Sequence, residues 1–408
     1  MRRLLRILMW TLSLLTIAAV AGVAWNWERL VRLYNVNHLF DEKNIVANFS
    51  SMKDLFFWTP IPRSGEVIPW PEDKTPIAAT YAWEGQEKPV AAWLEKTRTT
   101  SLLAVSDGRI AFEEYYLGTS ASDRRISWSM AKSFLSALFG IAVAEGNIPD
   151  LSAPVDSRVP ALKGTVYEGV SIRNVLNMAS GVRFNEDYLD FNSDINRMGR
   201  VLALGGSMNE FAASLEGRER EAGKLRQYTS IDTHVLAMVL EAATGRKLPE
   251  LMGDRLLSKL GPESEAYYLT DGFGVAFALG GINMTSRDYA RFGQMMLDMG
   301  RFAGREVIPS GWALVSVKAS APPSADPADK FGYGYQWWVP ERANGEFYAI
   351  GIYGQYIYVN RPARVVIVKT SADRGFRDDG ASGNRIEAET IEMFRAIAAG
   401  LSSRKRKT

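Results

Sequence analysis

Ser129 and Lys132 stand three residues apart in Ser129-Met130-Ala131-Lys132, at the head of an apolar stretch that predicts a helix from Met130 to Glu145. Residues at this spacing share one face of a helix, so the lysine amine can reach the serine hydroxyl. A helix start also offers free backbone N–H groups and a partial positive charge, which stabilise an oxyanion and favour a neutral amine. The pattern predicts a serine nucleophile with a lysine base.

The same Ser-x-x-Lys spacing occurs at Ser50 and at Ser402. The copy at Ser50 lies in a mixed polar and aromatic stretch, and the copy at Ser402 lies in a basic segment near the chain end. Neither is followed by an apolar helix, so we assign the chemistry to Ser129.

A second candidate group is Tyr228-Thr229-Ser230, which precedes the apolar helix predicted over Ile231 to Ala243. A phenol close to a lysine can relay protons, so Tyr228 is a candidate acid for the leaving group. Ser230 is a candidate to bind the lysine or the substrate.

The composition narrows the chemistry further. The chain of 408 residues has no cysteine, which excludes disulfides and a cysteine nucleophile, and two histidines, His38 and His234. We therefore predict a mechanism without histidine, metal or cofactor. A net charge of +2 gives no indication of nucleic-acid binding.

The N-terminus predicts a membrane segment over residues 1–27. Arg2, Arg3 and Arg6 precede an apolar run from Ile7 to Trp27 that is long enough to span a bilayer. We expect a single-pass anchor in the cytoplasmic membrane with the catalytic body on the periplasmic side. The alternative is a signal peptide cleaved after Ala19-Val20-Ala21, which would release the protein into the periplasm.

The remaining elements predict an α+β fold. Residues 28–94 are expected to form an irregular connector packed on a body of residues 95–400, and residues 401–408 a basic tail. The body contains a helical insert of about residues 125–300. This insert is preceded by a hairpin around Asp107-Gly108 and followed by strands at Tyr333–Val339, Phe347–Ile352, Gln355–Val359 and Val365–Thr370. We expect one antiparallel sheet built from N- and C-terminal segments, flanked by helices that include a last one at Arg385–Ala399, with the site where the sheet meets the helical subdomain.

These motifs resemble those of the class C β-lactamase and penicillin-binding-protein-like serine hydrolases. The resemblance spans about residues 95 to 400 and rests on Ser129-Met-Ala-Lys132, on Tyr228-Thr-Ser230 and on the segment Ser171 to Gly181 between them. It implies the β-lactamase/transpeptidase-like fold and an acyl-enzyme on Ser129.

The third motif of that family departs from its usual form. Where a basic residue, threonine and glycine are common, this chain has Ala349-Ile350-Gly351-Ile352, followed by Tyr353. The basic residue helps to bind the carboxylate of β-lactams and D-alanyl peptides, so its loss disfavours both. The segment instead resembles the branch that contains 6-aminohexanoate-dimer hydrolase and related carboxylesterases. That resemblance implies an oxyanion hole from the N–H groups of Ser129 and Ile352, and substrate contacts from Tyr188, Gly351 and Tyr353.

We therefore predict a serine hydrolase for small esters or linear amides. The alternatives are a D-alanyl peptidase or β-lactamase, and a ligand-binding scaffold that has lost turnover. Either Lys132 or Tyr228 is a candidate for the acylation base.

Overall fold

The computed structural model describes residues 2–377 and 384–405, and its centre is an antiparallel sheet. Seven strands take the order β11-β12-β13-β14-β15-β4-β5, so the hairpin near the N-terminus lies beside the last strand of the chain. The strands are β4 (Thr99–Ser106), β5 (Arg109–Tyr115), β11 (Gly332–Tyr333), β12 (Trp338–Val339), β13 (Glu346–Gly351), β14 (Gln355–Asn360) and β15 (Val365–Ser371). This arrangement confirms the predicted sheet of N- and C-terminal segments.

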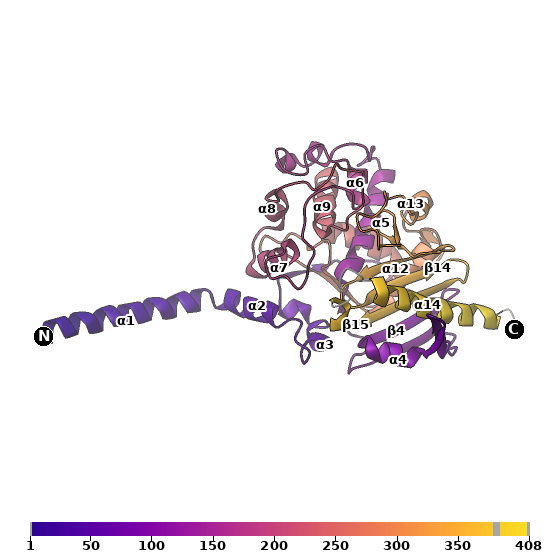
Figure 1. Ribbon diagram of the computed structural model, residues 1–408, viewed down its shortest axis with the longest axis horizontal. Coiled ribbons are helices and arrows are strands. Elements are labelled where there is room, and N and C mark those ends of the chain that lie inside the picture. The colour runs from indigo at the N-terminus through magenta and orange to yellow at the C-terminus, as the bar shows by residue number, and fades with distance from the viewer. Residues whose placement is uncertain (1, 378–383, 406–408) are drawn as a thin grey trace.

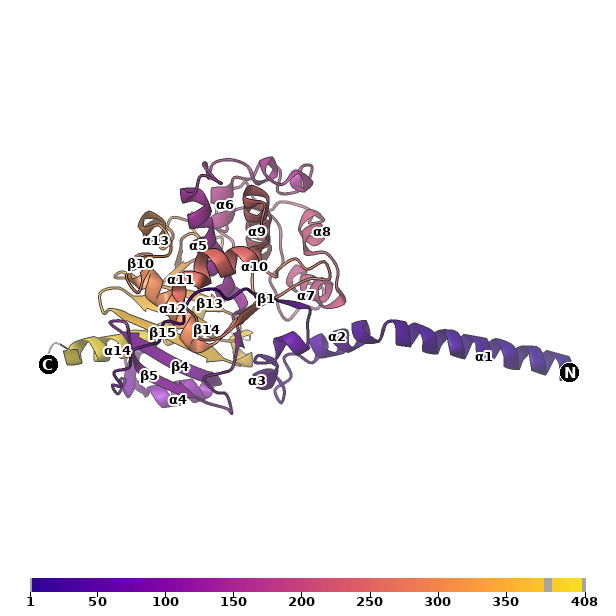
Figure 2. The same ribbon diagram turned by 180° about the vertical axis from the view of Figure 1, so that it is seen from behind.

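Helices cover both faces of the sheet, which explains why its central strands are apolar on both sides. One face packs on α4 (Val90–Lys96) and α14 (Asn384–Lys405). The other packs on α12 (Ser286–Leu297) and on the core of the helical part, as Figure 2 shows with α5 (Ala131–Ala144), α6 (Ile172–Leu176) and α9 (Ser230–Thr244) above the strands.

The predicted helical insert also contains strands, which the sequence reading missed. β6 (Arg125–Ile126), β7 (Ala266–Leu269) and β8 (Ile282–Met284) join β1 (Trp58–Ile61) in a second antiparallel sheet. The strands β6, β7 and β8 are short and buried throughout, so they lack the alternation that marks a strand with one solvent face. The insert also contains the α-helices α7 (Asp194–Leu204), α8 (Met208–Ala213), α10 (Leu248–Leu251) and α11 (Ser258–Leu260). After the insert, a short hairpin pairs β9 (Arg301–Phe302) with β10 (Arg305–Glu306), and α13 (Ser310–Val315) follows.

The N-terminal helix α1 (Arg2–Trp25) extends away from the body (Figure 1). Within it, Arg3–Trp25 is long and apolar enough to cross a membrane. A break at Asn26 separates it from α2 (Trp27–Asn37), which packs on α7 through a hydrogen bond from Arg32 Nε to the carbonyl of Ala203 (3.3 Å).

The segment expected to be an irregular connector is partly ordered into regular elements. Besides α2 and β1 it forms α3 (Ile45–Asn48) and a hairpin of β2 (Thr80–Trp83) with β3 (Gln86–Pro89). The short length of each element hid it among the prolines of this region.

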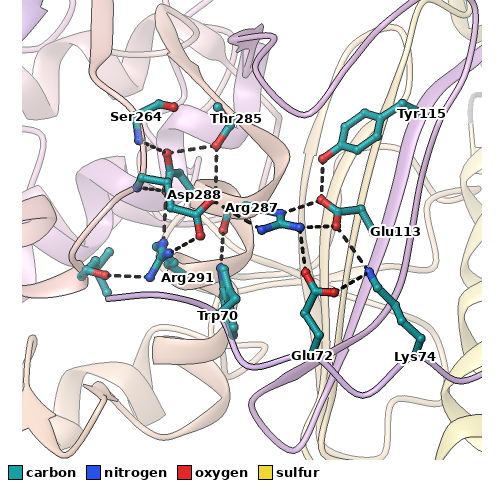
Figure 3. Close-up of polar contacts among 12 residues, drawn as sticks. Trp70, Glu72, Lys74, Glu113, Tyr115, Ser264, Thr285, Arg287, Asp288 and Arg291 are labelled. Carbon is teal, nitrogen blue, oxygen red and sulfur yellow. Dashed lines mark hydrogen bonds and ion pairs between the residues drawn. The ribbon is translucent and has the colours of Figure 1, made fainter. Parts of the chain in front are cut away.

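An ion-pair network ties this segment to the body (Figure 3). The guanidinium of Arg287, at the start of α12, donates to both oxygens of Glu113 on β5 at 2.7 Å and to Glu72 at 3.0 Å. The indole of Trp70 donates to the Arg287 carbonyl. Polar contacts thus fix residues 70–74 across the junction of the sheet and α12.

Two further expectations differ from the structure. Tyr333–Val339 forms two short paired strands, β11 and β12, because the backbone turns at Gln336, whose φ is +64°. The start of the expected basic tail is helical, since α14 continues to Lys405, while residues 406–408 lie outside the described residues.

Candidate active site

Ser129 lies in a 3-10 turn, Trp128–Met130, that leads directly into α5. Trp128 has a φ of +43°, in the left-handed region that is sparsely populated by residues with a Cβ. A strained backbone at this point marks a residue whose position the surrounding packing enforces, which is common next to a nucleophile. Helix α5 is apolar and buried over most of its length, so it anchors the turn rigidly.

The amine of Lys132 lies 2.8 Å from Ser129 Oγ, 3.2 Å from Ser230 Oγ and 3.1 Å from the carbonyl oxygen of Leu279. The lysine is 1% exposed. Burial lowers its pKa to about 7, and the carboxylate of Glu186 opposes this by favouring the charged form. A large fraction of the amine is therefore neutral near pH ~7 and can accept a proton from the hydroxyl.

Tyr228, in the turn before α9, and Ser230, the first residue of α9, complete the polar cluster around the Lys132 amine. Burial raises the pKa of Tyr228, with a further increase from Glu186, while contacts with the Ser129 and Ser230 hydroxyls oppose the rise. The Tyr228 ring stacks on Trp338, with centroids 5.5 Å apart, and the Lys132 amine lies 5.1 Å from its centroid. This packing holds the phenol protonated beside the serine.

The end of β13 lies against the turn that carries Ser129. A Cβ added to Gly351 would meet the carbonyl oxygen of Ser127 at 2.4 Å and the backbone nitrogen of Ser129 at 3.1 Å, so this position requires glycine. The close approach brings the backbone after Gly351, at Ile352, beside Ser129, and both residues line the same cavities.

Glu186 is a member of the site to which the sequence alone gave no role. Its carboxylate accepts hydrogen bonds from the backbone N–H of Ser230 and, at 3.3 Å, from the hydroxyl of Tyr188. Burial raises the pKa of Glu186, and Lys132 opposes that rise. The segment Phe184 to Tyr188 was singled out from the sequence, but only the fold shows that Glu186 is the acid whose charge acts on Lys132.

Two cavities meet at Ser129, and both are lined by Ser129, Tyr188, Leu189 and Ile352. The first, here called the apolar cavity, has a volume of about 300 Å³ and is walled mostly by aliphatic and aromatic side chains. The second, here called the polar cavity, has a volume of about 810 Å³ and contains Tyr228 and Glu186.

Tyr353 lines the apolar cavity, where its ring stacks on Phe40 with centroids 4.7 Å apart. Its φ is +65°, which turns the chain sharply after β13. The predicted site residues Ser129, Lys132, Tyr228, Ser230, Tyr188, Gly351, Ile352 and Tyr353 are thus brought together around one point.

The competing candidates have other contacts. The Ser50 hydroxyl accepts a hydrogen bond from Arg125 at 2.9 Å, and Ser402 lies in α14. His234 is buried in α9 against Asn209, and burial lowers its pKa to about 4. His38 bonds the carbonyl of Tyr34 within the N-terminal segment.

Comparison with known proteins agrees with this fold. Residues 90–392 match the family model described as Beta-lactamase. The chain is 34% identical over 293 residues to 6-aminohexanoate-dimer hydrolase of Paenarthrobacter ureafaciens, covering 68% of this chain and 74% of that protein.

Solved structures show the same architecture. A Bacillus anthracis protein provisionally described as a 6-aminohexanoate-dimer hydrolase superposes with a TM-score of 0.78 at 23% identity, over 90% of this chain and 96% of its own. A penicillin-binding protein from Bacillus halodurans gives a TM-score of 0.58 at 14% identity, over 74% of this chain and 99% of its own. A family VIII carboxylesterase gives a TM-score of 0.54 at 12% identity, over 75% of this chain and 94% of its own.

The chain belongs to the Beta-lactamase family, as both the family model and the identity to the Paenarthrobacter protein show. Within that family it is a serine hydrolase with the β-lactamase and penicillin-binding-protein fold.

Proposed function

We propose that the protein hydrolyses small esters or linear amides through an acyl-enzyme on Ser129. The observation that carries this proposal is the Ser129–Lys132 contact of 2.8 Å, made by a buried lysine whose pKa is lowered to about 7. A lysine in this state can act as the base for a serine nucleophile.

In the proposed reaction, Ser129 Oγ attacks the carbonyl carbon while Lys132 takes the hydroxyl proton. The backbone N–H groups of Ser129 and Ile352 stabilise the oxyanion. The bond to the leaving group then breaks as Tyr228 gives it a proton, and Tyr228 regains a proton from Lys132 through the hydroxyl of Ser230. Water next attacks the acyl carbon, which releases the acid and restores Ser129.

The polar cavity supports a neutral or cationic leaving group. Among the described residues it is lined by the acids Glu186, Asp187, Asp326, Asp329 and Glu387 and by two arginines. Both arginines are already paired, Arg226 with Asp329 at 2.6 Å and Arg220 with Glu219 at 3.0 Å. A substrate carboxylate, as in β-lactams and D-alanyl peptides, would meet this acidic lining while Ala349 and Ile350 occupy the position of the missing basic residue.

The alternatives make different predictions. A β-lactamase or D-alanyl peptidase would turn over a cephalosporin or be labelled by penicillin, and a scaffold would bind ligands without turnover. The 6-aminohexanoate dimer, the amide named for the Paenarthrobacter relative, is one substrate to test.

We also propose that α1 anchors the enzyme in the cytoplasmic membrane, with Arg2, Arg3 and Arg6 in the cytoplasm and the catalytic body outside. Fractionation of cells that express the full chain tests this placement. Release of the body into the soluble periplasmic fraction would support a cleaved signal peptide instead.

A further inference from the structure

The apolar cavity beside Ser129 is built in part by the segment that follows the membrane helix. Its wall contains one group from this N-terminal segment and another from the facing helix α7, namely Val36, Leu39, Phe40, Met52 and Phe56, and Ile195, Met198 and Leu202. The floor is Trp128, Ile352 and Tyr353 next to the nucleophile. One wall of the proposed substrate pocket is therefore formed by the stretch of chain that follows the proposed membrane anchor.

The two cavities have different places in the proposed reaction. Tyr228, the proposed donor of a proton to the leaving group, lines the polar cavity and not the apolar one. The leaving group consequently lies in the polar cavity, and the acyl group lies in the apolar cavity on the other side of Ser129. An apolar pocket of this size holds a hydrocarbon chain better than a polar group.

The rim of the apolar cavity carries large apolar side chains that are open to solvent. Leu189 and Phe191 line the cavity and are 61% and 65% exposed. Phe191 also packs under the guanidinium of Arg200, 4.0 Å from its ring centroid. Exposed aromatic and aliphatic groups at a pocket entrance, with an arginine beside them, suit a lipid surface.

Helix α2 carries a matching apolar stripe. Four exposed side chains recur at helical spacing, Trp27, Leu30, Val31 and Tyr34, at 61%, 44%, 37% and 62% exposure. This stripe follows α1 after a break at one residue, Asn26, so with α1 anchored as proposed the stripe begins at the bilayer surface. Figures 1 and 2 both show α2, α7 and α8 on the side of the body from which α1 leaves.

From these observations we infer that the α2 stripe and the rim at Leu189 and Phe191 rest on the bilayer that holds α1, and that the apolar cavity takes the acyl chain of a membrane-resident ester or amide with a polar leaving group. This inference rests on the proposed function of Ser129 and on the proposed anchoring of α1 in the membrane. The bilayer is the occupant because the helix that enters it continues directly into the stripe.

The cavity is tested by filling it. A Cβ at Gly199, in the part of α7 that lines the cavity, meets nothing within 4 Å, so Gly199→Phe is tolerated by the backbone and occupies the acyl space. Using the full chain in phosphatidylcholine vesicles, we expect the parent protein to prefer 4-nitrophenyl octanoate to the acetate, and the variant to lose at least about tenfold of that preference. Gly311→Phe, at an equally open helical position in α13, is the matched control. Equal losses on both esters, or no preference in the parent, would overturn the inference.

Bilayer contact is tested by charging the stripe. Leu30→Glu with Tyr34→Glu should lower hydrolysis of a long-chain 4-nitrophenyl ester embedded in the vesicles by at least about fivefold and leave the water-soluble butyrate ester unchanged. Arg29→Glu places an acid on the opposite side of α2 and should affect neither. Unchanged hydrolysis of the embedded ester would contradict the docking. Ser129→Ala distinguishes failure of the proposed function from failure of this inference. Activity of that variant on the acetate refutes the proposed function. Failure of the chain-length effects alone refutes only this inference.

Discussion

Gly351 and Ser129 are in such close backbone contact that no side chain fits between them. The ideal Cβ position at Gly351 is 3.1 Å from Ser129 N and 2.4 Å from the carbonyl oxygen of Ser127. The strand end and the nucleophile turn are thus mutually fixed, and that contact aligns the two proposed oxyanion donors.

Gly351→Ala should therefore reduce kcat by about 100-fold or more, because the shift of β13 moves Ile352 N–H away from the oxyanion. Stopped-flow or steady-state kinetics with 4-nitrophenyl butyrate measure the loss, and circular dichroism checks folding. Gly311→Ala is the control, since its Cβ meets nothing within 4 Å. Full activity of Gly351→Ala would show that the oxyanion is held elsewhere.

The pH dependence should report the state of Lys132. Its pKa is lowered to about 7, and the neutral amine is the active form. The rate of acylation should therefore rise with pH and level off above about 7 to 8, as the amine loses its proton. Single-turnover kinetics between pH ~5 and ~9 measure this profile. A rate that fell as the pH rose through 7 would contradict the role of the neutral lysine.

Glu186→Gln should move this profile toward lower pH. The carboxylate favours the charged form of Lys132, and glutamine removes that charge while its oxygen can still accept from the N–H of Ser230. Asp187→Gln, at an exposed neighbouring position, is the control. An unchanged pH profile would show that Glu186 acts only through its hydrogen bond with the backbone N–H of Ser230.

Tyr228→Phe should distinguish leaving groups. An amine or alkoxide needs a proton to leave, whereas 4-nitrophenolate does not. We expect about 100-fold or greater loss on linear amides and alkyl esters and a much smaller loss on 4-nitrophenyl esters. Equal losses on all substrates would point to Tyr228 as the acylation base.

Much of this site could be predicted because its chemistry depends on short local spacings. Ser129 and Lys132 are fixed by one helical turn, and the Tyr228 motif precedes another helix. Contacts that depend on tertiary packing could not be read in this way. The carbonyl of Leu279 that accepts from Lys132 is a backbone group without a sequence signature, and Glu186 is one of several acids in its loop.

For the fold, too, the elements set by local sequence patterns could be predicted and those set by tertiary packing could not. Long segments such as β14, β15 and α9 could be predicted, because their hydrophobic periodicity and their length both indicate the same type of element. The second sheet was missed because β6, at Arg125–Ile126, has two residues and pairs with β8, which is distant in sequence. The wall of the apolar cavity that residues 36–56 form was missed because its side chains meet α7 only after folding.

Ser129 is the proposed carrier of the acyl group, and mass spectrometry of the trapped acyl-enzyme is the decisive experiment. The full chain is quenched in acid during turnover of 4-nitrophenyl butyrate, digested and mapped. We expect a butyryl group on the peptide that contains Ser129, and loss of both label and hydrolysis in Ser129→Ala. A label on another residue, or undiminished hydrolysis by Ser129→Ala, would contradict it.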